Sequence, residues 1–354
     1  MGYNSYNIDF YRCEMTGWQI TAIGKILKIN ATEMLEDVDS AKVKLTRTLL
    51  TGEDVSLYTG EEKGKFPIIP GRRAVGQVTE LGSSSPLFEK GTRVVLSPVN
   101  PCGKCYHCAN GNPTECYDFS IAGKTTDGFL KDFAVVKTSG IFPLPQSVKD
   151  NEAVFTDDIA LALSVIDKLD VEKGQHVAIF GGSVFGSILA QLVIYYQGVP
   201  VLIDDNEQNL LNAKKSGIYY TLKVNARTEK EALAITGGRA FAKVAYLTRS
   251  GLSADLAFRL AAPSGRIAFA GYSFPNVKIP FPIALGKQLT TVSVTNGYGN
   301  YEPAINILAN KAVDLSVYTL PLTKMDDIET SVGKMAECYK NKQPLPDFMF
   351  NMLS

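Results

Sequence analysis

Four cysteines lie close together in the first half of the chain, spaced C-x2-C-x2-C-x7-C at Cys102, Cys105, Cys108 and Cys116. Four thiolates at such short spacing can surround one tetrahedral Zn²⁺ ion. A metal with four protein ligands has no open position for a substrate, so the spacing predicts a structural zinc site that holds one loop in place. Cys13 and Cys338 stand alone, and we interpret each as a small packing residue.

The composition of the chain indicates which kinds of partner it can bind. Lys plus Arg and Asp plus Glu each number 36 in 354 residues, so no net charge favours nucleic acid or an acidic membrane. No apolar stretch reaches the about 20 residues of a membrane-spanning helix, and the N-terminal segment lacks the pattern of a secretory signal. Clustered thiols are typical of a reducing compartment. We therefore expect a cytoplasmic protein whose partner is a small-molecule substrate, with no nucleic acid and no membrane.

The pattern of apolar residues changes near residue 150. Before it, short apolar or alternating runs between Gly, Pro and Ser turns predict a β-rich region, with runs at 18–27, 41–50, 74–81, 92–99 and 132–137. After it, strand-like runs alternate with helical patterns, beginning with an expected helix at 152–169, which predicts βαβ units on a parallel sheet. We expect one domain from residues 1–158 with 298–354, and a second from residues 159–297.

A glycine-rich turn follows the first strand-like run of the second region. It reads GGSVFG and comprises Gly181, Gly182, Ser183, Val184, Phe185 and Gly186. Between a strand and a helix, such a turn presents backbone N–H groups to a dinucleotide pyrophosphate. The next strand ends at Asp204 and Asp205, where an acid accepts ribose hydroxyls and repels a 2′-phosphate, so NAD is favoured over NADP. Ser183 replaces the middle glycine, and the competing interpretation is a tight turn that binds no nucleotide.

Three further segments carry a family resemblance. They are PIIPGRRAVGQVTELG (67–82), KGTRVVLSPVNPCGKCYHCANGNPTEC (90–116) and TDGFLKDFAVV (126–136). Together they resemble the medium-chain zinc-containing alcohol dehydrogenase family. The resemblance implies an α/β protein with a GroES-like β-rich catalytic domain and a Rossmann domain, whose doubly wound parallel sheet binds NAD. It also implies a homodimer or homotetramer, in which the expected edge strand at 289–297 pairs across a subunit interface.

The positions that match the family's catalytic zinc ligands do not suit a metal. They are occupied by Thr51, Arg72 and Asp157. A guanidinium has no lone pair to donate, and a threonine hydroxyl is a poor ligand. The chain has two histidines, His107 in the cysteine loop and His176 at the start of a predicted strand, so none is left for a second metal. We therefore expect one zinc ion per chain instead of two.

Several hypotheses for the altered pocket remain open. In the first, a zinc-independent NAD(H) oxidoreductase transfers hydride to or from a small carbonyl, enone or alcohol substrate. Arg72 stabilises an alkoxide or pairs with an anionic group of the substrate, and Glu53 or Asp54 exchanges a proton. In the second, Arg72 and Asp157 form an ion pair that fills the vacated position. In the third, an inactive pseudo-dehydrogenase binds NAD(H) or a small ligand as a sensor or scaffold. In the fourth, a relocated zinc uses Asp157 with Cys13, Glu53 or Asp54.

Overall fold

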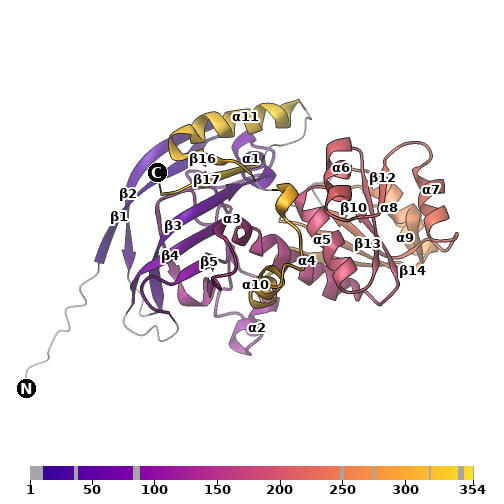
Figure 1. Cartoon of the computed structure of the whole chain (residues 1–354), viewed down its shortest axis with the longest axis horizontal. Coiled ribbons are helices and arrows are strands. Elements are labelled where there is room, and N and C mark those ends of the chain that lie inside the picture. Colours follow the sequence, from indigo (N-terminus) through magenta and orange to yellow (C-terminus); the bar gives the residue numbers. More distant parts are fainter. Residues whose placement is uncertain are drawn as a thin grey trace, which may run out of the picture. The chain divides into compact units, whose positions relative to one another are not determined.

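The computed structural model describes residues 11–35, 39–82, 88–247, 251–272, 276–318, 320–341 and 347–353. It divides into two compact units, Met1–Gln146 with Pro321–Ser354, and Ser147–Leu320 (Figure 1). We expected the boundaries after residues 158 and 297 instead. The second unit extends beyond the expected range because α4 (Thr156–Leu169) and α10 (Tyr301–Ala309) pack on each other, and α4 also packs on the strands of that unit.

A seven-stranded sheet forms the first unit, in the order β16-β17-β3-β4-β5-β9 with β8 pairing β3. Its strands are β3 (Ser40–Leu50), β4 (Arg73–Leu81), β5 (Arg93–Leu96), β8 (Phe133–Lys137), β9 (Ile141–Pro143), β16 (Leu322–Lys324) and β17 (Phe348–Asn351). The helices α1 (Gly52–Thr59) and α11 (Ile328–Lys340) pack together beside it. Leu45 and Val78 each lie between polar neighbours along their strands, and both belong to the core of the unit together with Val94.

The run at 18–27, expected as one strand, is a hairpin instead. β1 (Tyr11–Ala22) pairs antiparallel with β2 (Lys25–Leu35), and the chain reverses at Ile23 and Gly24. Gly24 has a φ of 73°, a left-handed conformation that glycine adopts without steric cost. The prediction was wrong because the apolar run continues through the turn, so the pattern of apolar residues did not indicate where the chain reverses.

The second unit contains a six-stranded parallel sheet in the order β12-β11-β10-β13-β14-β15. Its strands are β10 (His176–Phe180), β11 (Val199–Asp204), β12 (Tyr220–Lys223), β13 (Phe241–Leu247), β14 (Ala261–Ala270) and β15 (Thr290–Val294). The strand order reverses between β10 and β13, which is the point where doubly wound sheets bind ligands at the carboxyl ends of their strands. β15 lies at the edge, as the sequence predicted.

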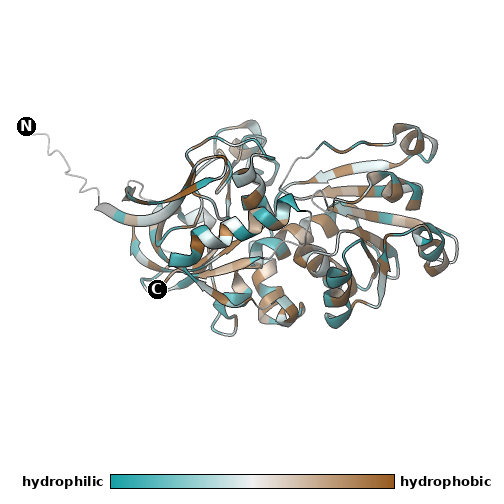
Figure 2. Cartoon of the chain, turned by 90° about the horizontal axis from the view of Figure 1, so that it is seen from above, coloured by the Kyte–Doolittle hydropathy of each residue, from teal (hydrophilic) through white to brown (hydrophobic). Residues whose placement is uncertain are grey.

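Helices connect these strands, as expected for βαβ units. They are α5 (Val184–Tyr195), α6 (Glu207–Lys215), α7 (Thr228–Ile235), α8 (Ala254–Leu260) and α9 (Phe281–Gly286). The helix expected at 152–169 is broken into α3 (Asp150–Ala153) and α4. Figure 2 shows hydrophobic residues in the strands and a mixture of hydrophobic and hydrophilic residues along the helices, which is the pattern of a sheet covered by amphipathic helices. None of the helices in the described ranges is long and apolar enough to cross a membrane.

Candidate functional site

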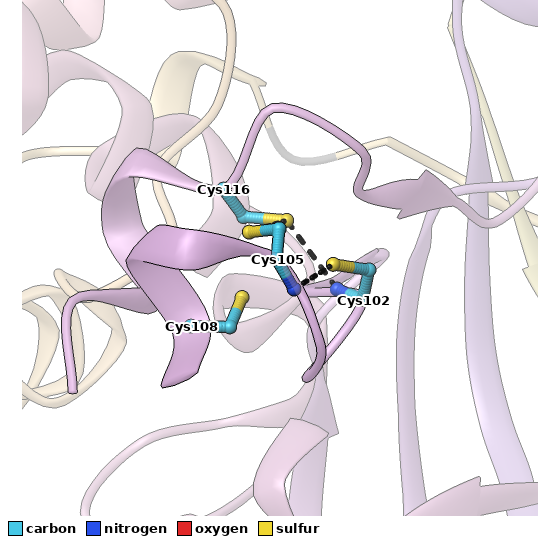
Figure 3. A group of neighbouring side chains, drawn as sticks. All are labelled: Cys102, Cys105, Cys108 and Cys116. Atoms are coloured by element: carbon cyan, nitrogen blue, oxygen red, sulfur yellow. Dashed lines mark hydrogen bonds between the residues drawn. The ribbon is translucent and has the colours of Figure 1, made fainter. Parts of the chain in front are cut away.

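The four clustered cysteines converge in one loop between β6 (Val99–Asn100) and β7 (Ser120–Ile121) (Figure 3). Their sulfur atoms all lie within 4.8 Å of one another, and Cys105 Sγ and Cys116 Sγ are 3.9 Å apart. A tetrahedron with Zn–S bonds of about 2.3 Å has sulfur atoms about 3.8 Å apart, so the four thiols fit one Zn²⁺. Among the described residues, no other group of three or more His, Cys, Asp or Glu side chains is placed to hold a metal.

Backbone groups of the loop already orient these sulfurs. The N–H of Cys102 donates to Cys116 Sγ, and the N–H of Cys105 donates to Cys102 Sγ, each at 3.3 Å. Hydrogen bonding with the Cys108 backbone lowers the pKa of Cys105 to about 6, whereas burial raises the pKa of Cys108 to about 12. A bound divalent cation would favour the thiolate form of all four. Such N–H···S bonds are the outer interactions that hold thiolate ligands in position.

The glycine-rich turn lies at the carboxyl end of β10, beside the point where the strand order reverses. Gly181 has a φ of 116°, and a Cβ on Gly186 would lie 1.9 Å from the Gly181 carbonyl oxygen. The turn therefore requires glycine at both ends. Ser183 is the N-cap of α5, is exposed, and makes no capping hydrogen bond with its side chain. Val184 and Phe185 form the first turn of α5.

Asp204, at the end of β11, is bound to this turn. Its carboxylate accepts hydrogen bonds from the Gly182 N–H, from the Asn206 N–H at 2.7 Å and from Asn209 Nδ2 at 3.2 Å. Burial raises the pKa of Asp204, and these donors oppose the rise. A carboxylate offers about four acceptor positions, which leaves one for a ribose hydroxyl. Asp205, the other predicted acid, is exposed.

Thr51 and Glu53, two predicted site residues, form a network at the start of α1. The Thr51 hydroxyl donates to Glu53 Oε2 at 2.5 Å, and Arg73 Nη1 donates to both Thr51 Oγ1 and Glu53 Oε2 at 3.2 Å. Arg73 and Glu53 are buried or nearly so, with side-chain exposures of 4% and 13%. These contacts tie the first turn of α1 to β4. Because the Thr51 hydroxyl donates to Glu53 and accepts from Arg73, its oxygen is unsuited to bind a metal.

Asp54 is the second acid at this helix start, and it is 3% exposed. Its carboxylate accepts the N–H of Thr51 at 2.9 Å and the N–H of Gly71 at 2.8 Å. Burial raises the pKa of Asp54, and the charge of the fully buried Arg72 partly offsets the rise. The guanidinium therefore contributes electrostatically to holding this carboxylate in an apolar region.

The raised pKa of Asp54 predicts a pH dependence of stability. The folded protein binds this proton more tightly than the unfolded chain, so the carboxyl favours folding below its ordinary pKa of 3.8 and loses that contribution as the pH rises through the folded value. In Asp54→Asn this titration is absent. The urea midpoint of the variant, relative to that of the wild type at the same pH, should therefore rise between about pH 4 and pH 7. A difference that stays constant with pH would contradict the expectation.

Asp157, the third predicted residue of the altered pocket, lies in the first turn of α4 in the second unit. Its Oδ1 accepts the hydroxyl of Tyr272 at 2.7 Å and the hydroxyl of Tyr301 at 2.6 Å. Sequence analysis missed both tyrosines. Tyr272 could have been noticed because it follows the end of a predicted strand, but nothing local distinguishes Tyr301 from a packing residue.

Two cysteines and two histidines named from the sequence remain to be placed. Cys338 is half-buried in α11. The side chain of Cys13 lies outside the described residues, so its part in a relocated zinc site stays untested. His107 Nδ1 is 3.4 Å from the Glu115 carboxylate beside the cysteine loop, and His176 begins β10.

Comparison with known proteins agrees with this arrangement. Residues 37–146 match the family model of the alcohol dehydrogenase GroES-like domain. An uncharacterized zinc-type alcohol dehydrogenase-like protein of Haemophilus influenzae is 24% identical, over 82% of this chain and 86% of its own length. The sorbitol dehydrogenase of Bacillus subtilis is 25% identical, over 85% of this chain and 89% of its own. Over most of its length the chain is similar to medium-chain zinc-type alcohol dehydrogenases, and residues 37–146 carry their GroES-like domain.

Solved structures support the same fold for this dehydrogenase-like chain. A zinc-binding dehydrogenase of Sinorhizobium meliloti bound to NADP and a short chain alcohol dehydrogenase of Escherichia coli CFT073 complexed with NADH each give a TM-score of 0.81. Each is 20% identical and covers 96% of this chain and 99% of its own. The expected combination of a GroES-like domain with a Rossmann domain is confirmed.

Proposed function

We propose that the chain is an NAD(H)-dependent oxidoreductase that interconverts a small alcohol, of the polyol kind, with its carbonyl compound. The observation that carries the proposal is the glycine-rich turn at the switch point, which is bound through Gly182 to the carboxylate of Asp204. A sorbitol dehydrogenase and a D-xylulose reductase are among the proteins that the chain resembles, which supports an alcohol-carbonyl interconversion. NAD supplies the hydride acceptor or donor, and the turn and Asp204 would hold its pyrophosphate and adenosine ribose.

We propose one zinc ion per chain, held by Cys102, Cys105, Cys108 and Cys116. The residues at the family's catalytic-metal positions do not fit a second ion. Arg72 is a permanent cation, the Thr51 hydroxyl is bonded to Glu53 and Arg73, and Asp157 Oδ1 already accepts two phenols. The chemistry would then depend on protein groups for the charge that develops on the substrate oxygen.

A direct test combines three measurements on the purified protein. Elemental analysis should give one zinc ion per chain, and the fluorescence of NADH should report its binding. Absorbance at the NADH band should then fall with D-fructose or with a panel of simple aldehydes and ketones, and rise with NAD⁺ and sorbitol. Two zinc ions per chain, or no NADH binding, would contradict the proposal.

The second candidate function is a pseudo-dehydrogenase that binds NAD(H) without turnover. The observation in its favour is that Thr51, which matches a metal-ligand position of the family, is bonded to Glu53 and Arg73 instead. NADH binding with no turnover on the whole panel would favour this candidate. Turnover of any carbonyl compound would exclude it.

Substitution of Asp204 should change both affinity and cofactor preference. In Asp204→Asn the amide carries no charge to repel a 2′-phosphate, and it replaces one acceptor oxygen by a donor. Loss of a hydrogen bond to a charged group costs about 1.5–3 kcal/mol, so NADH affinity should fall roughly 10- to 100-fold. The ratio of NADPH to NADH affinity should rise at the same time.

Asp205→Asn is the matched control, because Asp205 is the exposed neighbour of Asp204 and makes none of the contacts with the turn. Titration of NADH and NADPH fluorescence measures all four affinities. Equal changes for the two variants would show that Asp204 has no special part in cofactor binding.

We also propose that the protein is a homodimer or a homotetramer, paired through β15. Among the strands that the structure describes, the one neighbour of β15 in the sheet is β14, and Thr290, Thr291 and Ser293 on β15 are exposed. An edge strand of this kind is a template for pairing with another chain. Light scattering during size-exclusion chromatography gives the mass directly, and a monomeric mass would contradict the proposal.

A further inference from the structure

An ion pair lies at the carboxyl end of the parallel sheet, beside the acid of the proposed ribose site. Lys223 Nζ donates to Glu207 Oε1, and the two side chains are 49% and 77% exposed. The hydrogen bond with Lys223, and then its charge, lowers the pKa of Glu207, so Glu207 is an anion at neutral pH. Sequence analysis named neither residue.

The sheet holds Lys223 next to Asp204. Lys223 is the last residue of β12 and pairs in register with Asp204, the last residue of β11. The Val224 N–H donates to the Asp204 carbonyl at 2.9 Å, which extends the pairing to the ends of both strands. Neighbouring strands lie about 4.8 Å apart, and residues in register project from the same face of a sheet. The Lys223 side chain therefore begins beside that of Asp204.

Glu207 reaches the same place from the connection between β11 and α6. It is the first residue of α6, directly after the N-cap Asn206. The Asn206 N–H donates to Asp204 Oδ1 at 2.7 Å, so this short connection is held against the same carboxylate. α6 in turn packs against β12 (Figure 1). Two strand ends and one helix start thus bring Asp204, Glu207 and Lys223 together.

An ordinary surface contact is the competing interpretation of this pair. Exposed ion pairs contribute little to stability, and salt screens them. The position of the pair gives it a further use. A dinucleotide whose ribose hydroxyls meet Asp204 has its 2′ position beside that carboxylate. In NADP this position carries a phosphate, which a lysine ammonium binds and a carboxylate repels.

We propose that Glu207 and Lys223 set the choice between NAD and NADP in this protein. The inference rests on the proposed function, in which Asp204 binds the adenosine ribose. Lys223 is the cation that a 2′-phosphate would meet, whereas Glu207 occupies this cation and adds a negative charge of its own. The chain then rejects NADP through two acids, Asp204 and Glu207, and removal of Glu207 makes Lys223 a phosphate ligand.

Glu207→Gln tests this directly, because it removes the charge and keeps the size of the side chain. A hydrogen bond to a charged group is worth about tenfold in affinity or more, so the dissociation constant of NADPH should fall about tenfold. NADH has a hydroxyl at the 2′ position, so its constant should change by less than about threefold. When Lys223→Met is added to Glu207→Gln, the gain for NADPH should disappear. Titration of the fluorescence of each reduced cofactor measures both constants.

Glu172→Gln and Lys173→Met are the matched controls. Both residues are exposed and precede β10, at the opposite end of the sheet from the proposed ribose site. The two controls change the net charge by the same amounts and should keep the wild-type ratio of NADPH to NADH affinity. A thermal melt of each variant shows that it is folded.

A ligand without nicotinamide gives a second readout. Calorimetric titration of Glu207→Gln with adenosine 2′,5′-bisphosphate should show the same gain as NADPH, and adenosine 5′-monophosphate should show none. The gain should shrink when the salt is raised from about 50 mM to about 500 mM, because exposed charges are screened.

The outcomes separate this inference from the proposed function. An unchanged ratio of affinities in Glu207→Gln, a gain that persists after Lys223→Met, or an equal gain in Glu172→Gln would overturn the inference while the proposed function stands. A wild type that prefers NADPH would also overturn it, because Glu207 would then not exclude the phosphate. A wild type that binds neither cofactor is a failure of the proposed function, and the inference fails with it if Glu207→Gln does not bind adenosine 2′,5′-bisphosphate.

Discussion

Cys116→Ser is expected to remove the zinc ion and to destabilise the unit that carries the cysteine loop. Cys116 is 3% exposed, and its sulfur accepts the Cys102 N–H, so it is both a ligand and part of the loop's own bonding. Structural zinc contributes about 10–16 kcal/mol to the folding of small zinc-dependent peptides. A larger unit with its own core retains part of its stability, so we expect a loss of several kcal/mol. That corresponds to a fall in melting temperature of about 10 °C.

Elemental analysis and a thermal melt measure both effects on the same sample. Cys338→Ser is the matched control, because Cys338 is a half-buried cysteine of α11 that lies outside the cluster. It should keep one zinc ion per chain and melt within a few degrees of the wild type. A Cys116→Ser protein with undiminished zinc would show that the four thiols do not form the site.

Chelation extends the same argument to function. The thiolate site has four protein ligands and takes no part in the proposed chemistry, so NADH affinity in the other unit should survive as long as the protein stays folded. Loss of the metal and loss of stability should therefore occur together, and loss of cofactor binding should follow unfolding.

Features that depend on short stretches of chain were predictable from the sequence. The cysteine spacing predicted a loop whose sulfurs all lie within 4.8 Å, because three of the four ligands are only three residues apart. The strand, glycine turn and terminal acid of the second unit were likewise predictable, since each follows from local backbone requirements. The parallel sheet followed from the alternation of strand-like and helix-like runs.

Features that depend on contacts between distant residues were not predictable. Asp157 and Tyr301 are 144 positions apart, and no local pattern indicates that a phenol and a carboxylate will meet. The turn at Gly24 was hidden within an apolar run, and the unit boundaries depended on how α4 and α10 pack. The role of Asp204 was only partly foreseen. Its place at a strand end predicts a ribose ligand, which stays a prediction, and the structure shows its carboxylate accepting the Gly182 N–H of the glycine turn.

Gly186→Ala is expected to weaken dinucleotide binding, because this position has no room for a methyl group. An added Cβ would lie 1.9 Å from the Gly181 carbonyl oxygen and 2.9 Å from its carbon, both of them backbone atoms of the turn itself. Relief of that contact must move Gly181 or the first turn of α5, and with them the N–H groups that would face the pyrophosphate in the proposed site. Overpacking of this kind costs about 1–3 kcal/mol. That cost corresponds to a fall in NADH affinity of about 5- to 150-fold, since each 1.4 kcal/mol is about a tenfold change.

Gly286→Ala is the matched control in the same unit. Gly286 ends α9, and a Cβ there would meet no atom within 4 Å. Alanine is favoured over glycine in a helix by up to about 1 kcal/mol, so this variant should bind NADH normally and melt at or slightly above the wild-type temperature. Zinc content separates a local effect from general misfolding, because the cysteine loop belongs to the other unit and should keep one ion per chain in Gly186→Ala. Wild-type NADH affinity in Gly186→Ala would mean that the turn is not the cofactor site, and the proposed function would then lose the observation that carries it.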